Sequence, residues 1–270
     1  MKKFVVKENS TLKRFTDGVY PQGSFCLAAL LRAKDIKVNG VRVSKDLPLN
    51  AGDEVTYYTS PKQEAMLSHN VVYEDENVYI ADKLSGVSYE GLLSELCERG
   101  EFFGVHRLDR NTQGLIVFAK NKAAEEELLS AFAERRVIKN YIALCKNNFK
   151  KEHETLVSYL KKDEKSATVK IFNEEKRGSV KIITEYRVVE TRKDLALVRI
   201  TLLTGKTHQI RAHMAFIGCP VLGDNKYGDG ELNKKYSAKR QCLISKQLGF
   251  CLDGNLKYLS GKLFKSVFEL

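Results

Sequence analysis

The feature that most restricts how this chain can fold is a polar segment followed directly by an apolar run. The segment places one carboxylate, Asp109, between Arg107 and Arg110. Residues 115–119 are too uniformly apolar for a water-exposed edge and predict a central, buried strand. Gly114 permits the sharp turn that leads into it. We therefore expect Asp109 near the start of a core strand, kept ionised by the positive charges beside it.

The composition favours a globular protein with a polyanionic partner. Of 270 residues, 43% are hydrophobic and 29% are charged, as in ordinary folded domains. Lys and Arg number 45 against 34 Asp and Glu, which leaves a net charge of +11. This excess favours a phosphate-rich partner, because each neutralised phosphate releases counterions. A lysine-rich surface without such a partner is the alternative.

Cysteine spacing and hydropathy limit the class of protein further. The six cysteines show no C-x-x-C spacing, and the first residues lack the apolar core of a signal peptide. No apolar run approaches the roughly 20 residues that a membrane helix needs. We expect a reduced, cytoplasmic, monomeric protein that does not contact membranes.

Residues 1–60 have the pattern of a small separate unit. Helix-like apolar spacing covers residues 11–15 and 25–32, and the Pro-Gln-Gly of residues 21–23 predicts a break between them. Residues 36–43 predict a hairpin with an Asn-Gly turn. Ten basic and six acidic side chains give the segment a net charge of +4.

The remaining chain predicts a second, larger unit. Residues 61–70 are polar, begin with proline and have no period, which is typical of a linker before residues 71–270. Residues 71–81 predict two strands around an acidic turn. Residues 121–136 predict a helix that Asn121 caps and that two arginines close.

Two further segments carry polar side chains in useful positions. Residues 137–144 alternate as a strand, so Lys139 and Tyr141 share one face. Residues 146–181 carry many lysines, several acids and turn residues, and predict an exposed hairpin region.

A strand at residues 195–203 leads through a Thr-Gly-Lys turn into a helix that Thr207 can cap. On this helix His208 and Arg211 are three residues apart and project together. Arg211 thus lies on a rigid element close to a turn, which suits a functional cation.

These segments contain sequence blocks that resemble those of RluA-type pseudouridine synthases, which isomerise uridine to pseudouridine in structured RNA. The blocks are H-R-L-D-R-x-T-x-G-L at 106–115, K-x-Y-x-A-L at 139–144, T-G-K-T-H-Q-I-R-x-H at 204–213 and I-G-x-P-V-x-G-D at 217–224. The resemblance covers roughly residues 71–228. It implies an α+β fold with a mixed, mainly antiparallel central sheet, an RNA substrate and no cofactor.

The resemblance also implies roles for single residues. Asp109 would be the catalytic aspartate, Tyr141 the active-site tyrosine that packs on the target base, and Arg211 the cation that pairs with the aspartate. An ionised carboxylate can attack the ribose C1′ or abstract a proton from C2′, and a flipped-out base needs an aromatic face. We further assign RNA contacts to seven basic side chains: Arg107, Arg110, Lys139, Lys206, His208, Lys37 and Arg42.

Residues 1–60 resemble the αL-type RNA-binding module first seen in a ribosomal small-subunit protein, through the hairpin and the A-G-D-E-V at 51–55. An ordinary small α/β unit is the alternative. The module favours ribosomal over transfer RNA as the substrate. The chain departs from the family at residues 83–86, where K-L-S-G replaces K-P-x-G, and at Lys206, which replaces an arginine. A divergent target RNA would be consistent with these changes.

Each site residue also has a structural explanation when taken alone. An aspartate between arginines is typical of a surface ion pair, and Tyr141 of a core strand. His208 and His213 are five residues apart and do not share a helical face, so we predict no metal site. The alternative hypothesis is that the chain is an RNA-binding or RNA-chaperone protein on a synthase scaffold that has lost activity. The presence of Asp109, Tyr141 and Arg211 together favours the enzyme.

Overall fold

The computed structural model describes residues 1–163 and 167–270. Its main sheet contains eleven strands within these residues: β7 (His69–Glu74), β8 (Val78–Lys83), β9 (Phe103–Gly104), β10 (Gln113–Ala119), β11 (Val137–Lys146), β12 (His153–Asp163), β13 (Thr168–Phe172), β14 (Val180–Arg192), β15 (Leu195–Leu202), β16 (Leu243–Phe250) and β17 (Leu263–Lys265). Their order is β13-β12-β14-β15-β11-β16-β10-β8-β7, with β17 beside β16 and β9 beside β10. The predicted α+β fold with a mainly antiparallel sheet is confirmed. Among the described residues no helix is long and apolar enough to cross a membrane.

One pair of strands in this sheet, β10 and β16, is parallel, with Gly114 opposite Ser245. Gly114 has a φ of +109°, and a Cβ there would lie 2.3 Å from the carbonyl oxygen of Ser245. Only glycine allows both this conformation and this close approach. β16 thereby joins β10 to β11 and connects two halves of the sheet.

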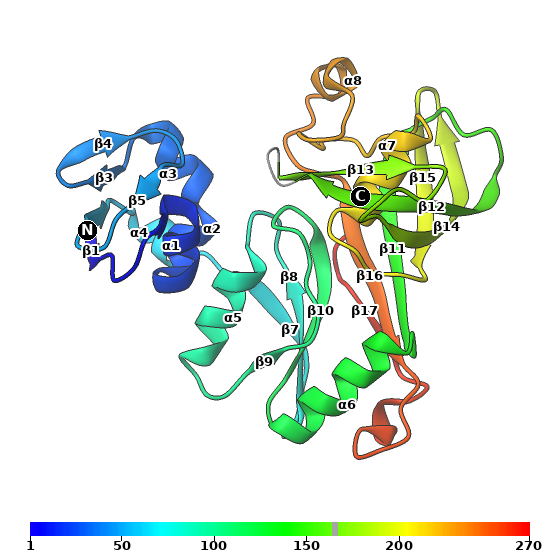
Figure 1. Cartoon of the computed structure of the whole chain (residues 1–270), viewed down its shortest axis with the longest axis horizontal. Coiled ribbons are helices and arrows are strands. Elements are labelled where there is room, and N and C mark those ends of the chain that lie inside the picture. The colour runs from blue at the N-terminus through cyan, green and yellow to red at the C-terminus, as the bar shows by residue number, and fades with distance from the viewer. Residues whose placement is uncertain (164–166) are drawn as a thin grey trace.

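The helices of this larger part lie on the sheet and at its ends (Figure 1): α5 (Tyr89–Cys97), α6 (Lys122–Ala133), α7 (Gln209–Phe216), α8 (Gly230–Lys235) and the 3-10 turn η1 (Lys257–Leu259). The predicted cap of α6 is confirmed, because the Asn121 side chain accepts the backbone N–H of Ala124. The predicted cap of α7 is wrong. His208, not Thr207, precedes the helix, with a φ of 56° and no side-chain cap bond. The Gln209 side chain accepts the Lys206 N–H instead, so the chain is still turning at Thr207.

The first sixty-four residues contain a small sheet with the order β1-β6-β3-β4, a short β2-β5 pair and four helices. The elements are β1 (Lys2–Val5), β2 (Ser10–Thr11), α1 (Leu12–Val19), α2 (Pro21–Phe25), α3 (Leu27–Ala33), β3 (Ile36–Val38), β4 (Val41–Val43), β5 (Pro48–Leu49), β6 (Glu54–Tyr57) and α4 (Pro61–Glu64). The hairpin turn is confirmed, with Asn39 and Gly40 at positive φ of 49° and 81°. The predicted break between the two helical segments exists, but it lies at Tyr20 and not at residues 21–23. Pro21 occupies the first position of α2, where its missing N–H costs nothing.

The exposed hairpin predicted within residues 146–181 corresponds to β12 and β13, which pair antiparallel. Residues 164–166 of that prediction lie outside the described residues. The two strands predicted within residues 71–81 are β7 and β8, joined by the acidic turn.

Candidate active site

Asp109 lies in the loop between β9 and β10, beside a cleft of about 570 Å³. The preceding Leu108 is buried in the main apolar cluster and anchors the loop. The backbone N–H of Thr112 donates to the carbonyl of Asp109 at 3.1 Å and closes a turn. The carboxylate itself is 17% exposed. It lines the cleft, so a ligand can reach it.

Arg211, on α7, joins two carboxylates. Its Nη1 donates to Oδ2 of Asp109 at 2.7 Å, while Nε and Nη2 donate to the two oxygens of Asp224 at 2.6 and 2.9 Å. The side chains of Arg211 and Asp224 are buried. Burial lowers the pKa of Arg211, but hydrogen bonds and charge from Asp224 and Asp109 outweigh it and raise this pKa. The guanidinium therefore keeps a positive charge beside Asp109.

Asp224 is a functional residue to which the sequence analysis gave no role. Its Oδ1 also accepts the backbone N–H groups of Lys226 and Tyr227 at 2.8 and 3.1 Å. Burial raises the pKa of Asp224, and the bonds and charge of Arg211 outweigh this and lower it. The signal for it was the I-G-x-P-V-x-G-D block, which ends on this acid.

His208 lies next to Asp109 in the cleft and contacts Tyr227 behind it. Nδ1 of His208 lies 2.9 Å from the Tyr227 hydroxyl, and Nε2 lies 3.9 Å from Oδ2 of Asp109. The centre of the Tyr227 ring is 5.2 Å from the Arg211 guanidinium carbon. Burial lowers the pKa of His208 more than the Asp109 charge raises it. A neutral imidazole thus faces the carboxylate at neutral pH.

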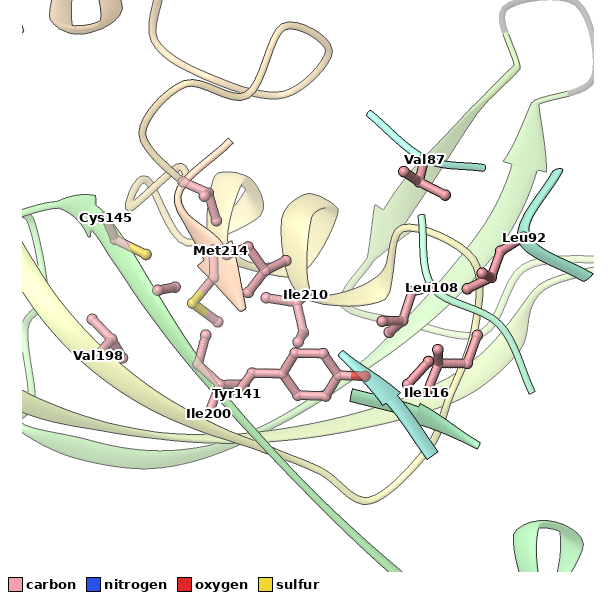
Figure 2. Packing of buried hydrophobic residues seen from close by; sticks show 14 of the residues in the cluster. Val87, Leu92, Leu108, Ile116, Tyr141, Cys145, Val198, Ile200, Ile210 and Met214 are labelled. Atoms are coloured by element: carbon pink, nitrogen blue, oxygen red, sulfur yellow. The ribbon is translucent and has the colours of Figure 1, made fainter. Parts of the chain in front are cut away.

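Tyr141 projects from β11 into the main core. Figure 2 shows its ring extending toward Leu108 and Ile116, with Ile210 beside it. The residue is 7% exposed and also lines the cleft. Burial raises the pKa of Tyr141 to about 12, although the Ser245 side chain partly opposes this. The phenol is therefore protonated at neutral pH and can donate a hydrogen bond but not act as a phenolate.

The two arginines that flank Asp109 have other partners, which corrects the expectation that they hold its charge. Arg107 pairs with Glu90 at 3.2 Å. Arg110 donates to both carboxylate oxygens of Asp17 at 2.7 and 2.8 Å. Side chains of adjacent loop residues point in different directions, so neighbours in sequence need not be neighbours in space. Arg211, 102 positions along the chain, supplies the counter-charge instead.

The K-L-S-G segment of residues 83–86 holds the Asp109 loop by hydrogen bonds to its backbone carbonyls. Nζ of Lys83 donates to the carbonyls of Val87 at 2.8 Å and Arg110 at 3.1 Å. The N–H of Gly86 donates to the same Arg110 carbonyl at 2.9 Å, and the Ser85 hydroxyl to that of Asn111 at 3.1 Å. Burial and the charge of Arg110 lower the pKa of Lys83 to about 7. Although K-L-S-G differs from the family block K-P-x-G, its residues contact the loop that carries Asp109.

The cleft brings seven of the predicted site residues together: Asp109, Tyr141, Arg211, Arg107, Lys139, Lys206 and His208. Arg135 and Lys181 also line it and add positive charge that sequence reasoning did not assign. Lys37 and Arg42 do not line the cleft. They lie opposite each other on β3 and β4, and Lys37 Nζ and Arg42 Cζ are each 5.6 Å from the centre of the Tyr58 ring. Arg110 does not line it either, because it turns toward α1.

Comparisons with known proteins identify similar sequences and folds. The family described as RNA pseudouridylate synthase matches residues 88–216. An uncharacterized RNA pseudouridine synthase of Bacillus subtilis, YlyB, is 31% identical over 80% of this chain and 77% of that protein. A ribosomal large subunit pseudouridine synthase C of Vibrio cholerae is 31% identical over 74% of this chain and 70% of that protein. The solved structure of human RNA pseudouridylate synthase domain containing 1 superimposes with a TM-score of 0.59 and 26% identity, over 68% of this chain and 79% of that one.

Proposed function

Because this chain belongs to the RluA-type family of RNA pseudouridine synthases, which isomerise uridine to pseudouridine in RNA, we propose that the cleft around Asp109 is its active site. The observation that carries the proposal is the 2.7 Å hydrogen bond from Arg211 Nη1 to the Asp109 carboxylate within that cleft. A partly exposed carboxylate with a fixed counter-charge is suited to attack on a sugar carbon or to proton abstraction.

In the proposed reaction Asp109 acts on the ribose of the target uridine. The N1–C1′ bond breaks, the base turns and a C5–C1′ bond forms. The C5 proton leaves to solvent and N1 takes up a proton, so that substrate and product are isomers. The carboxylate either attacks C1′ or removes the C2′ proton, and both routes require its ionised form. Arg211 supplies the counter-charge to that form through its hydrogen bond to Oδ2.

Tyr141 supplies the aromatic face for the flipped-out base in this proposal. Its buried position beside the cleft and its protonated phenol support stacking and hydrogen-bond donation. Replacing it with phenylalanine keeps the face and removes the donor. Single-turnover rates of Tyr141→Phe and Tyr141→Ala on the same RNA therefore separate the two contributions.

We assign the cations around the cleft, namely Arg107, Lys139 and Lys206, to RNA phosphates, and the neutral His208 to a hydrogen bond with the RNA. Arg110 is left out of this set because its side chain is bound to Asp17. Residues 1–60 form the RNA-binding module of the proposal, with Lys37 and Arg42 on its hairpin, residues 61–70 as the connection and residues 71–270 as the catalytic domain. The module's own apolar cluster supports this division. The short helix α4 and its Ser60–Gln63 capping box lie in the connection and make it less extended than a free linker.

The proposed substrate is ribosomal RNA, in line with the Vibrio cholerae relative, a ribosomal large subunit pseudouridine synthase C. The protein would act as a monomer in the cytoplasm, where this RNA is found. The alternative is an inactive RNA-binding or RNA-chaperone protein. It is less favoured, because a site without catalytic activity does not require a buried arginine shared between two carboxylates.

The test is tritium release from RNA that carries 5-³H-uridine, taken from cells without this gene. We expect release by the wild-type protein and none by Asp109→Asn, which keeps the side-chain shape. Asp253→Asn is the matched control, since that side chain is 89% exposed. Equal release by Asp109→Asn and wild type would remove Asp109 from the mechanism. If neither protein releases tritium from total RNA, the inactive alternative is favoured.

A further inference from the structure

Asp17, on α1, is a buried carboxylate shared between the N-terminal module and the Asp109 loop. It is 6% exposed. Its oxygens accept both hydrogen bonds of Arg110 Nη2, at 2.7 and 2.8 Å, and the hydroxyls of Ser24 and Ser88. Ser88 also caps α5 through the Gly91 N–H. The carboxylate thus has a donor from its own module, from α5 and from the loop that carries Asp109.

Arg110, the residue directly after Asp109, is fixed at both its side chain and its backbone. Its Nη1 donates to the carbonyls of Ser24 at 2.9 Å and Gly86 at 3.2 Å. Its own carbonyl accepts from Lys83 Nζ and from the Gly86 N–H. A shift of the Arg110 side chain would therefore act on the backbone that positions Asp109.

Apolar packing gives the module a defined position against the catalytic part. Phe25, from α2, is 7% exposed within the apolar cluster that also contains Leu92, Leu96 and Leu108. The Ser94 hydroxyl donates to the Gly18 carbonyl at 3.3 Å. Helices α1 and α2 contact α5 (Figure 1). The ion pair of Asp17 is one part of a continuous interface.

We propose that Asp17 is a positioning residue for the isomerisation: it holds the Arg110 side chain and, through the Arg110 backbone, keeps the Asp109 carboxylate against Arg211. Without Asp17 the Arg110 side chain loses two hydrogen bonds, and the backbone next to Asp109 can shift. The module then contributes to the chemical step as well as to RNA binding. This inference rests on the catalytic role proposed for Asp109.

The experiment uses the full chain and single-turnover tritium release at saturating enzyme, with RNA affinity measured separately. Asp17→Asn should lower the rate about 10- to 100-fold, as expected for a misplaced reacting group, and leave the Kd for RNA unchanged. Arg110→Gln should lower it too, and the double variant should be no slower than the slower single variant, since both remove one interaction. Asp17→Glu should recover part of the rate.

Glu54→Gln is the matched control, because Glu54 forms an exposed ion pair with Lys3 inside the module. Thermal unfolding identifies variants that do not fold; if Asp17→Asn is one, Arg110→Gln and Asp17→Glu give the same test. A wild-type rate in these variants, a change in Kd alone, or additive losses in the double variant would overturn the inference. Asp109→Asn in the same assay separates the two proposals: if it is silent while Asp17→Asn is fully active, only the positioning role fails.

Discussion

Asp224 holds Arg211 by two hydrogen bonds, to Nε and Nη2, and leaves Nη1 directed at Asp109. Asp224 therefore fixes the position of Arg211, while Arg211 supplies the counter-charge to Asp109. Because Asp224 is fully buried and also accepts two backbone N–H groups, it has little freedom to move.

Asp224→Asn should impair both folding and catalysis. Removing one partner of a buried ion pair costs about 3–5 kcal/mol of unfolding free energy, and a shift of about 1 Å at Arg211 costs about 100-fold in rate. Urea unfolding and single-turnover tritium release measure the two effects. Asp194→Asn, which alters an exposed pair with Lys235, should change neither. A fully active Asp224→Asn would show that Arg211 needs no such support.

Lys83 predicts a distinct pH dependence of stability. Its pKa is lowered from 10.5 to about 7 in the folded state, first by burial and then by Arg110. Between these pH values the unfolded chain binds one proton more than the folded chain. The unfolding free energy should therefore rise with pH by about 1.4 kcal/mol per unit, and this stability is lost as the pH falls toward 7.

Lys83→Met isolates this contribution, because other titrating groups cancel in the comparison. Urea unfolding of both proteins from pH 6 to 10 should give a wild-type minus variant difference that increases with pH above about 7. The loss of hydrogen bonds to carbonyls such as Val87 adds only a constant offset. A difference that does not vary with pH would mean that Lys83 keeps an ordinary pKa.

Lys37→Ala with Arg42→Ala should weaken RNA binding without changing the rate at saturating enzyme. Both side chains lie on the β3–β4 hairpin, apart from the cleft. If each contacts one phosphate, the slope of log K against log salt should fall by up to about 2. The control is Lys151→Ala with Arg192→Ala, which removes two cations that local carboxylates already pair. An unchanged salt slope would exclude the hairpin from the RNA contact.

Gly114→Ala should destabilise the protein strongly. The new Cβ would lie 2.3 Å from the Ser245 carbonyl oxygen, and the φ of +109° is unfavourable for alanine. Gly52→Ala is the control, because Gly52 has a φ of +94° but open space around it. We expect about 1–2 kcal/mol for the control and clearly more than about 3 kcal/mol at Gly114. Equal losses in urea unfolding would show that β10 and β16 can separate at little cost.

Local elements were predictable from the sequence where a short pattern has one physical solution. The Asn39-Gly40 turn and the Asn121 cap are of this kind, because the residues that decide them are a few positions apart. The boundaries of α2 and α7 were not. Pro21 is compatible with both a break and a helix start, and Thr207 and His208 are both plausible positions before a helix.

The chemistry of the site was only partly predictable. The pairing of Asp109 with Arg211 followed from a resemblance of whole sequence blocks, while its isolation from Arg107 and Arg110 depends on contacts with Glu90 and Asp17 far away in sequence. The same holds for the place of β16 in the sheet. Periodicity predicts that a strand exists but not which strand it pairs with.

The place of β16 bears on how the protein is made. Synthesis proceeds from the N-terminus, so the half of the sheet that carries Asp109 and the half that carries Arg211 leave the ribosome before β16 does. Since β16 lies between β10 and β11, these halves have no shared strand until it inserts. A nascent chain that ends before Leu243 holds the carboxylate and the arginine but lacks the frame that brings them together. Each new chain can therefore acquire enzymatic activity only after β16 has been synthesised and has inserted into the sheet.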